Sequence, residues 1–121
     1  MKSKNDPRHQ KRIKLVQALF AWNTNQASIP KEISSIVSKI SEIDQLIAEA
    51  APKWPLKQIS QVDLATLRYS VWELKNNQEV PQKVIIDEAI EIGKEFGNES
   101  SASFINAVLG HILKNQNDPQ S

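Results

Sequence analysis

Apolar residues recur along most of the chain at spacings of three and four, the period of a helix with one buried face. No stretch alternates apolar and polar residues convincingly with the period of two that marks a half-buried strand. The pattern therefore predicts an all-α protein, a compact helical bundle of about five helices in two packed subdomains.

The first predicted helix has Asp6 as its N-cap and Pro7 at its first position, where the missing N–H of proline costs nothing. It is expected to run through Trp22 and to end at the polar residues that follow. Its core-facing positions fall on two adjoining edges: Ile13, Val16 and Phe20 on one, and Leu15, Leu19 and Trp22 on the other. The helix is therefore expected to bury much of its second half.

A second helix is expected to begin near Ser28 or Ile29. Its apolar stripe is Ile33, Ile36, Val37, Ile40, Ile43 and Ile47. Pro52 and Pro55 end it and mark the one convincing internal boundary. The sequence thus predicts an N-terminal helical pair over residues 7–51.

Residues 61–75 form the third predicted helix, with Ser60 and Asp63 in the Ser-x-x-acid capping pattern. The helix carries two apolar stripes: Leu64, Leu67, Val71 and Leu74, and Val62, Ala65, Tyr69 and Trp72. A helix that is apolar on two faces must be covered from two directions, so it is expected at the centre of the molecule.

Two further helices complete a C-terminal three-helix subdomain over residues 56–114. Pro81 opens the fourth helix and Gly97 ends it, with a buried stripe of Ile85, Ala89, Ile92 and Phe96. Ser100 or Ser101 caps the fifth, which buries Phe104, Val108 and Ile112 and, beside them, Ile105, Leu109 and Leu113. Residues 115–121 have nothing to bury and are expected to form a flexible tail.

Composition excludes several classes of function. The chain has 121 residues, enough for a single domain, and its lack of cysteine excludes disulfides, zinc–thiolate sites and cysteine nucleophiles. No apolar run is long enough to cross a bilayer and no signal peptide is apparent, so a cytoplasmic protein without membrane contact is expected.

Charge is distributed unevenly. Residues 1–14 contain six basic residues and one acidic residue, so this end carries +5 and the remaining 107 residues carry −4. A basic end on an acidic body can direct contact with a polyphosphate such as nucleic acid. The alternative is a basic N-terminus that only aids solubility.

Few residues have the pattern of a catalytic site. The two histidines, His9 and His111, lie far apart in the sequence, and no Gly-rich phosphate loop is present. Asp87 and Glu91 lie one turn apart, a spacing that can chelate a cation but more often just faces water. We therefore expect a binding protein rather than an enzyme, with no metal and no cofactor.

The first helix changes character along its length. Arg8 and Arg12 continue the line of Leu15 and Leu19, so a stripe that is core further along is cationic in its first two turns. These turns are expected to remain unburied and to project past the bundle. Guanidinium groups suit phosphate, and exposed aromatic rings suit unstacked bases, although core packing is the commoner role of such rings.

Several segments, taken in order, resemble the NusB transcription antitermination family. They are residues 16–22 (VQALFAW), 62–74 (VDLATLRYSVWEL), 80–97 (VPQKVIIDEAIEIGKEFG) and 103–109 (SFINAVL). The resemblance extends over about residues 8–113. It implies a NusB-like all-helical fold and a non-catalytic role.

The resemblance also implies partners. Family members pair with the small-subunit ribosomal protein NusE, and the pair binds boxA RNA so that RNA polymerase in the antitermination complex reads through terminators, notably in ribosomal RNA operons. The RNA-binding positions that this implies are Arg8, His9, Lys11, Arg12, Lys14, Phe20, Ser100 and Phe104. The implied NusE-binding positions are Asp63, whose alternative role is helix capping, and Glu73. Arg68 and Asn106 also match motif positions, with local hydrogen bonding as their alternative role.

The N-terminal half is shorter than in most family members, which insert another helix between Trp22 and Pro30. We expect lower local stability there or a compensating contact, such as self-association into a homo-oligomer. Two other function classes stay open: an RNA-binding accessory module for an RNA methyltransferase, and a helical adaptor that binds only protein.

Overall fold

The computed structural model describes residues 6–117, and this part of the chain is all-α, with no strand. Its α-helices are α1 (Pro7–Thr24), α2 (Ser34–Val37), α3 (Ile40–Ala50), α4 (Gln61–Asn76), α5 (Gln82–Phe96) and α6 (Ser101–Asn117). Two short 3-10 helices, η1 (Lys31–Ile33) and η2 (Leu56–Gln58), precede α2 and α4. The predicted fold class is confirmed. None of these helices is long and apolar enough to span a membrane.

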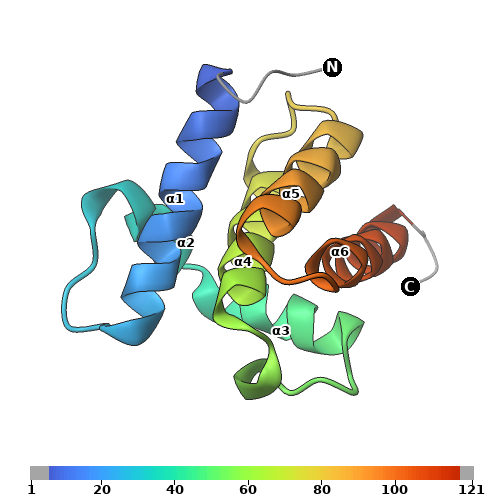
Figure 1. Ribbon diagram of the computed structural model, residues 1–121, viewed down its shortest axis with the longest axis horizontal. Coiled ribbons are helices and arrows are strands. Elements are labelled where there is room, and N and C mark those ends of the chain that lie inside the picture. The colour runs from blue at the N-terminus through green and yellow to red at the C-terminus, as the bar shows by residue number, and fades with distance from the viewer. Residues whose placement is uncertain (1–5, 118–121) are drawn as a thin grey trace.

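Helix α4 lies at the centre, as its two apolar stripes predict. Every residue from 63 to 71 is buried, and α4 packs against α1, α3, α5 and α6. Figure 1 shows α4 between α1 on one side and α5 and α6 on the other. The largest side chains without solvent contact are contributed by all these helices, among them Leu19, Ile47, Leu67, Ile92 and Leu109. Core residues from both halves of the chain therefore form one continuous cluster.

Two of the predicted N-caps are present, those of α1 and α4, whereas the Ser100 hydroxyl donates to Oδ1 of Asn98 and the Ser101 hydroxyl accepts from the N–H of Asn98. The Asp6 carboxylate accepts a hydrogen bond of 2.8 Å from the backbone N–H of Arg8 at the start of α1. The Ser60 hydroxyl accepts one of 3.2 Å from the N–H of Asp63 at the start of α4. Helix α5 ends at Gly97 as expected. These local signals set the helix ends because each satisfies a backbone group that the helix leaves unpaired.

The long second helix predicted from the isoleucine stripe is broken. The chain instead forms η1, α2 and α3, with Lys39 at φ −113° between the last two. Two serines here donate from their hydroxyls to backbone carbonyls three residues back: Ser34 to Lys31 at 3.0 Å and Ser38 to Ser35 at 2.7 Å. Such local bonds compete with regular helix formation.

Two further expectations are wrong at the C-terminal ends of helices. The predicted buried stripe of α5 includes Phe96, but this residue is 41% exposed because it is the last residue of the helix. Helix α6 continues through Asn117, so residues 115–117 are helical rather than a loose tail. The rest of the predicted tail, and Lys2 and Lys4 of the basic end, lie outside the described residues.

Candidate nucleic-acid interface

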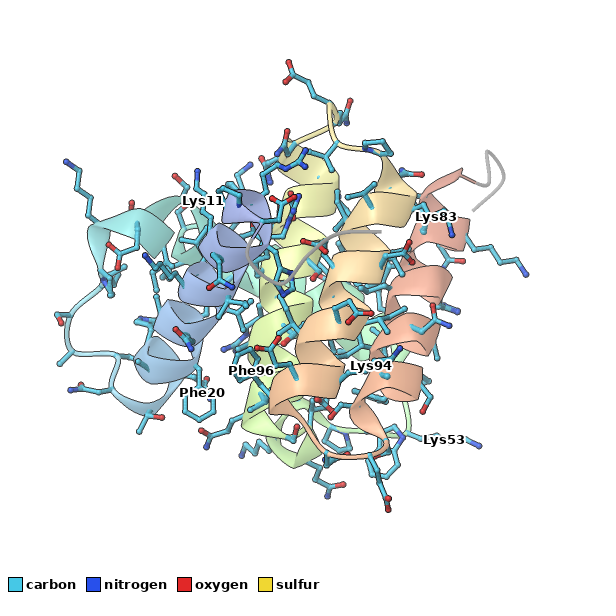
Figure 2. All side chains as sticks on the ribbon, turned by 45° about the horizontal axis from the view of Figure 1, so that its top comes forward. Lys11, Phe20, Lys53, Lys83, Lys94 and Phe96 are labelled. Atoms are coloured by element: carbon cyan, nitrogen blue, oxygen red, sulfur yellow. The ribbon has the colours of Figure 1, made fainter. Side chains whose placement is uncertain are left out.

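Three cationic side chains of α1 face solvent. Lys11 and Lys14 are exposed, and Figure 2 shows Lys11 directed away from the rest of the bundle. The side chain of Arg8 is 74% exposed, and its guanidinium donates to both carboxylate oxygens of Asp6 at 3.2 and 3.0 Å. The hydrogen bonds that Arg8 donates to Asp6, followed by the negative charge of Asp6, raise the pKa of Arg8. Part of the expected cationic surface is therefore present.

Arg12 and His9 contradict the expectation that the first two turns project past the bundle. They are only 7% and 5% exposed. The Arg12 guanidinium donates from Nε and Nη2 to the two oxygens of Glu73, at 3.0 and 2.7 Å, and from Nη1 to Oε1 of Glu88 at 3.1 Å. His9 Nδ1 lies 3.1 Å from Oε1 of the same Glu88. These two side chains face inward and cannot offer an open phosphate contact.

Glutamates on the neighbouring helices explain this burial. Glu73 on α4 and Glu88 on α5 are 2% and 4% exposed, so each must have a partner inside the protein. The hydrogen bond with Glu73 is the main cause of the raised pKa of Arg12. Glu73 was also expected at a partner surface, and that placement is wrong because its carboxylate is occupied within the core. We call Arg12, His9, Glu73 and Glu88 the buried charge cluster.

Tyr69 lies one turn before Glu73 on α4 and is 6% exposed. Burial raises the pKa of its phenol, and the nearby carboxylate of Glu73 raises it further. Tyr69 therefore stays neutral and forms part of the surroundings of the buried charge cluster.

Asp63, the other expected partner contact, is 5% exposed. Its backbone N–H donates to the Ser60 hydroxyl, so Ser60 acts as the cap, and the Oδ1 of Asp63 has no hydrogen-bond partner among the described residues. A contact of Asp63 with a protein partner remains a prediction.

The expected aromatic and hydroxyl contacts lie at another part of the surface. Phe20 is 38% exposed, Ser100 is exposed and Phe104 is half-buried at the first turn of α6. Phe20 is nine residues from Lys11, which places it about 180° around α1 at 3.6 residues per turn. The structure therefore does not bring all eight predicted RNA-binding residues onto one face.

Arg68 forms local hydrogen bonds, which was the alternative role expected for it. Its guanidinium donates from Nε and Nη2 to the carboxylate of Asp44 on α3, both at 2.9 Å, and from Nη1 to the side-chain oxygen of Asn23 on α1 at 2.9 Å. It also lies 5.7 Å from the centre of the Trp22 ring. Arg68 thus ties α4 to α1 and α3. Asn106, by contrast, is exposed.

Sequence reasoning missed two features. The buried charge cluster joins residues that lie 61 to 79 positions apart in the sequence. The one feature of the sequence that indicated it is that Arg12 lies on the same apolar stripe as Leu19. Trp54, in the link after α3, is 53% exposed and packs against Phe104. Within residues 6–117, no three His, Asp or Glu side chains are grouped so as to hold a metal ion.

Fold and surface together define a small all-α protein with exposed cations on its first helix. Residues 29–114 match the NusB family. The chain is 36% identical to the transcription antitermination protein NusB of Lachnoclostridium phytofermentans over 80% of this chain and 79% of that one, and 35% identical to that of Listeria monocytogenes over 87% and 94%. The match to the protein of Sorangium cellulosum spans only 59% of that relative.

A solved structure of T. maritima NusB superposes with a TM-score of 0.82 at 32% identity, over 94% of this chain and 93% of that one. The chain belongs to the NusB family. It is therefore a transcription antitermination protein and not an enzyme, and the family implies that it works in an antitermination complex with RNA.

Proposed function

We propose that the chain binds boxA-like single-stranded RNA in nascent transcripts, together with the small-subunit ribosomal protein NusE. In the cytoplasm, this complex would help RNA polymerase to read through terminators in ribosomal RNA operons. Family membership supports the proposal, and the exposed cations of α1 are the observation that carries it.

Lys11 and Lys14 are spaced by three on the solvent side of α1, and no ion pair of either lysine is found within residues 6–117. Exposed lysines attract phosphate, and Arg8 adds a planar guanidinium near the positive N-terminus of the same helix. The proposed phosphate contacts are therefore Arg8, Lys11 and Lys14. His9 and Arg12 act indirectly, because the buried charge cluster fixes the helix that carries these contacts.

Phe20, Ser100 and Phe104 are the proposed base contacts. A strand that runs from the cationic side of α1 around its C-terminal end would reach Phe20 and then the start of α6. Aromatic rings bind unstacked bases of any sequence, whereas hydroxyls add hydrogen bonds. Asp63 remains the proposed NusE contact on α4.

Fluorescence anisotropy with a labelled boxA-like RNA, at several salt concentrations and with or without NusE, tests the proposal. Lys11→Ala/Lys14→Ala should lower the slope of log affinity against log salt by about 1.4, because each lost phosphate contact removes about 0.7 for a single strand. Lys83→Ala/Lys114→Ala is the matched control, since both lysines are exposed on α5 and α6.

An unchanged slope in Lys11→Ala/Lys14→Ala would remove α1 from the RNA site. No gain in RNA affinity from NusE would contradict joint binding. Recovery of a protein partner without any RNA binding at moderate salt would instead favour a pure protein adaptor.

A further inference from the structure

Trp54 lies in the link between α3 and α4 and leaves 53% of its surface in solvent. Its backbone N–H donates to the carbonyl of Ala51 at 3.0 Å, which closes a turn. Pro52 and Pro55 flank it and limit the backbone freedom of the link. The indole is therefore displayed from a constrained segment, so little conformational entropy would be lost when it binds a ligand.

One side of the indole is already occupied. Its ring centre lies 6.5 Å from that of Phe104, with the planes at 79°, an edge-to-face pair that fixes the orientation of the indole. The other tryptophans differ: Trp22 is 7% exposed and Trp72 is half-buried. Core packing accounts for those two but not for the exposed part of Trp54.

We propose that Trp54 is a base-stacking residue for single-stranded RNA, next to Phe104 on the same surface. This inference rests on the proposed function and extends it. The RNA strand would continue past the start of α6 onto the link between α3 and α4. An unstacked base would lie against the solvent-facing part of the indole.

Charge favours RNA over a protein as the occupant. The segment 51–61 has two lysines, Lys53 and Lys57, and no acidic residue, and both lysines are exposed. Figure 2 shows Lys53 extending from the molecule into solvent. Cationic side chains beside an exposed aromatic ring are the usual combination in single-strand binding surfaces. Continuity with Phe104 then makes the RNA of the proposed function the fitting ligand.

A thermodynamic cycle tests the stacking directly. Trp54→Ala should weaken binding of a boxA-like RNA by about five- to tenfold, the lower end for base–aromatic stacking, whereas Trp54→Phe should stay within about twofold because it keeps a flat ring. The same variants are then measured on RNAs with one abasic site moved along the strand. At the position that stacks on Trp54, the abasic RNA should bind wild type more weakly and Trp54→Ala should cause no further loss.

Acrylamide quenching supplies an independent readout. Trp54 is the most exposed of the three tryptophans, so the quenchable component should be missing in Trp54→Phe and should be protected by RNA in wild type. Thermal unfolding of each variant shows whether the link still folds.

The outcomes separate the two proposals. If wild type binds no RNA with or without NusE, the proposed function fails. If wild type binds RNA with a Lys11- and Lys14-dependent salt slope, but Trp54→Ala binds equally well and RNA does not protect the indole, the stacking role of Trp54 is overturned. An equal loss on every abasic RNA, together with a lower Tm, also overturns it because the residue would then act only on the fold.

Discussion

Arg12 links α1 to two neighbouring helices. Its guanidinium makes bonds to α4 and α5 at once, through Glu73 and Glu88. Removing these charges from water is costly, and only the complete set of partners offsets that cost. Loss of Arg12 would leave the buried Glu73 carboxylate without its guanidinium partner, so a substitution at Arg12 should be strongly destabilising.

Arg12→Ala should lower the free energy of unfolding by about 3–5 kcal/mol, the range for breaking a buried ion pair. Urea unfolding followed by circular dichroism measures this change. Arg8→Ala is the matched control on the same helix; its side chain is 74% exposed, so its stability should stay close to that of wild type. A stable Arg12→Ala variant with weakened RNA binding would mean instead that Arg12 contacts RNA.

Tyr69, the only tyrosine of the chain, allows a prediction about pH. Burial raises the pKa of its phenol in the folded protein above the value of about 10 in unfolded chains. Above about pH 10 the unfolded chain therefore loses a proton that the folded protein keeps, so stability should fall as pH rises. Tyrosinate absorbance should appear only together with unfolding, and Tyr69→Phe should lessen the alkaline loss. Ionisation of Tyr69 in the folded protein near pH 10 would contradict this.

At the scale of helices, the sequence predicts what local rules decide. Asp6 and Ser60 identify two helix starts correctly because a cap acts on backbone groups within three residues. The two apolar stripes of α4 predict its central position because a helix that is apolar on two faces must be covered from two directions. The break between α2 and α3 was missed because apolar spacing alone does not show that serine hydroxyls bond to nearby carbonyls.

The three glycines of the chain should respond differently to alanine. A Cβ on Gly97 would lie 2.7 Å from the carbonyl oxygen of Gly93 and 2.7 Å from Cβ of Ser101, so α5 and α6 would have to shift. A Cβ on Gly93 would lie 2.7 Å from the Cδ1 end of the Ile105 side chain, and its next contacts, Cβ of Ser101 at 3.5 Å and N of Ala102 at 3.6 Å, are ordinary van der Waals distances. Gly97→Ala should therefore destabilise more than Gly93→Ala, as measured by thermal unfolding.

Gly110→Ala is the control for this series. Nothing lies within 4 Å of its added Cβ, and alanine is favoured over glycine inside a helix by about 1 kcal/mol. This variant should be more stable than wild type. A loss of stability in Gly110→Ala as large as that in Gly97→Ala would show that close packing of α5 on α6 is not what requires glycine at position 97.

At the scale of the molecule, the candidate interface was only partly predictable. A resemblance assigns roles to positions, but it does not show which side chains neighbouring helices turn inward. Arg12 and Lys11 are adjacent and both cationic, yet one is buried and the other exposed, because glutamates distant in the sequence meet the first. The sequence also does not show that the apolar Trp54 is exposed, because its exposure depends on how the link between α3 and α4 packs on α6.

The same long-range contacts determine how the two halves unfold. The N-terminal half was expected to be locally weak, but Arg68 ties it to α4 through Asp44 on α3 and Asn23 on α1. With one continuous core, amide protons of α3 and α4 should exchange through the same global opening. Arg68→Ala leaves Asp44 without its partner and should cost about 3 kcal/mol.

Native-state hydrogen exchange distinguishes a local loss of stability from a global one. In Arg68→Ala, exchange in α3 should accelerate more than exchange in α4, because the bonds lost are those that hold α3 against the central helix. Arg8→Ala should change neither helix, since its ion pair lies at the exposed end of α1. If α3 already exchanges far faster than α4 in wild type, Arg68 is not enough to stabilise the N-terminal half, and contact with a second copy or with NusE becomes the stabilising element to test.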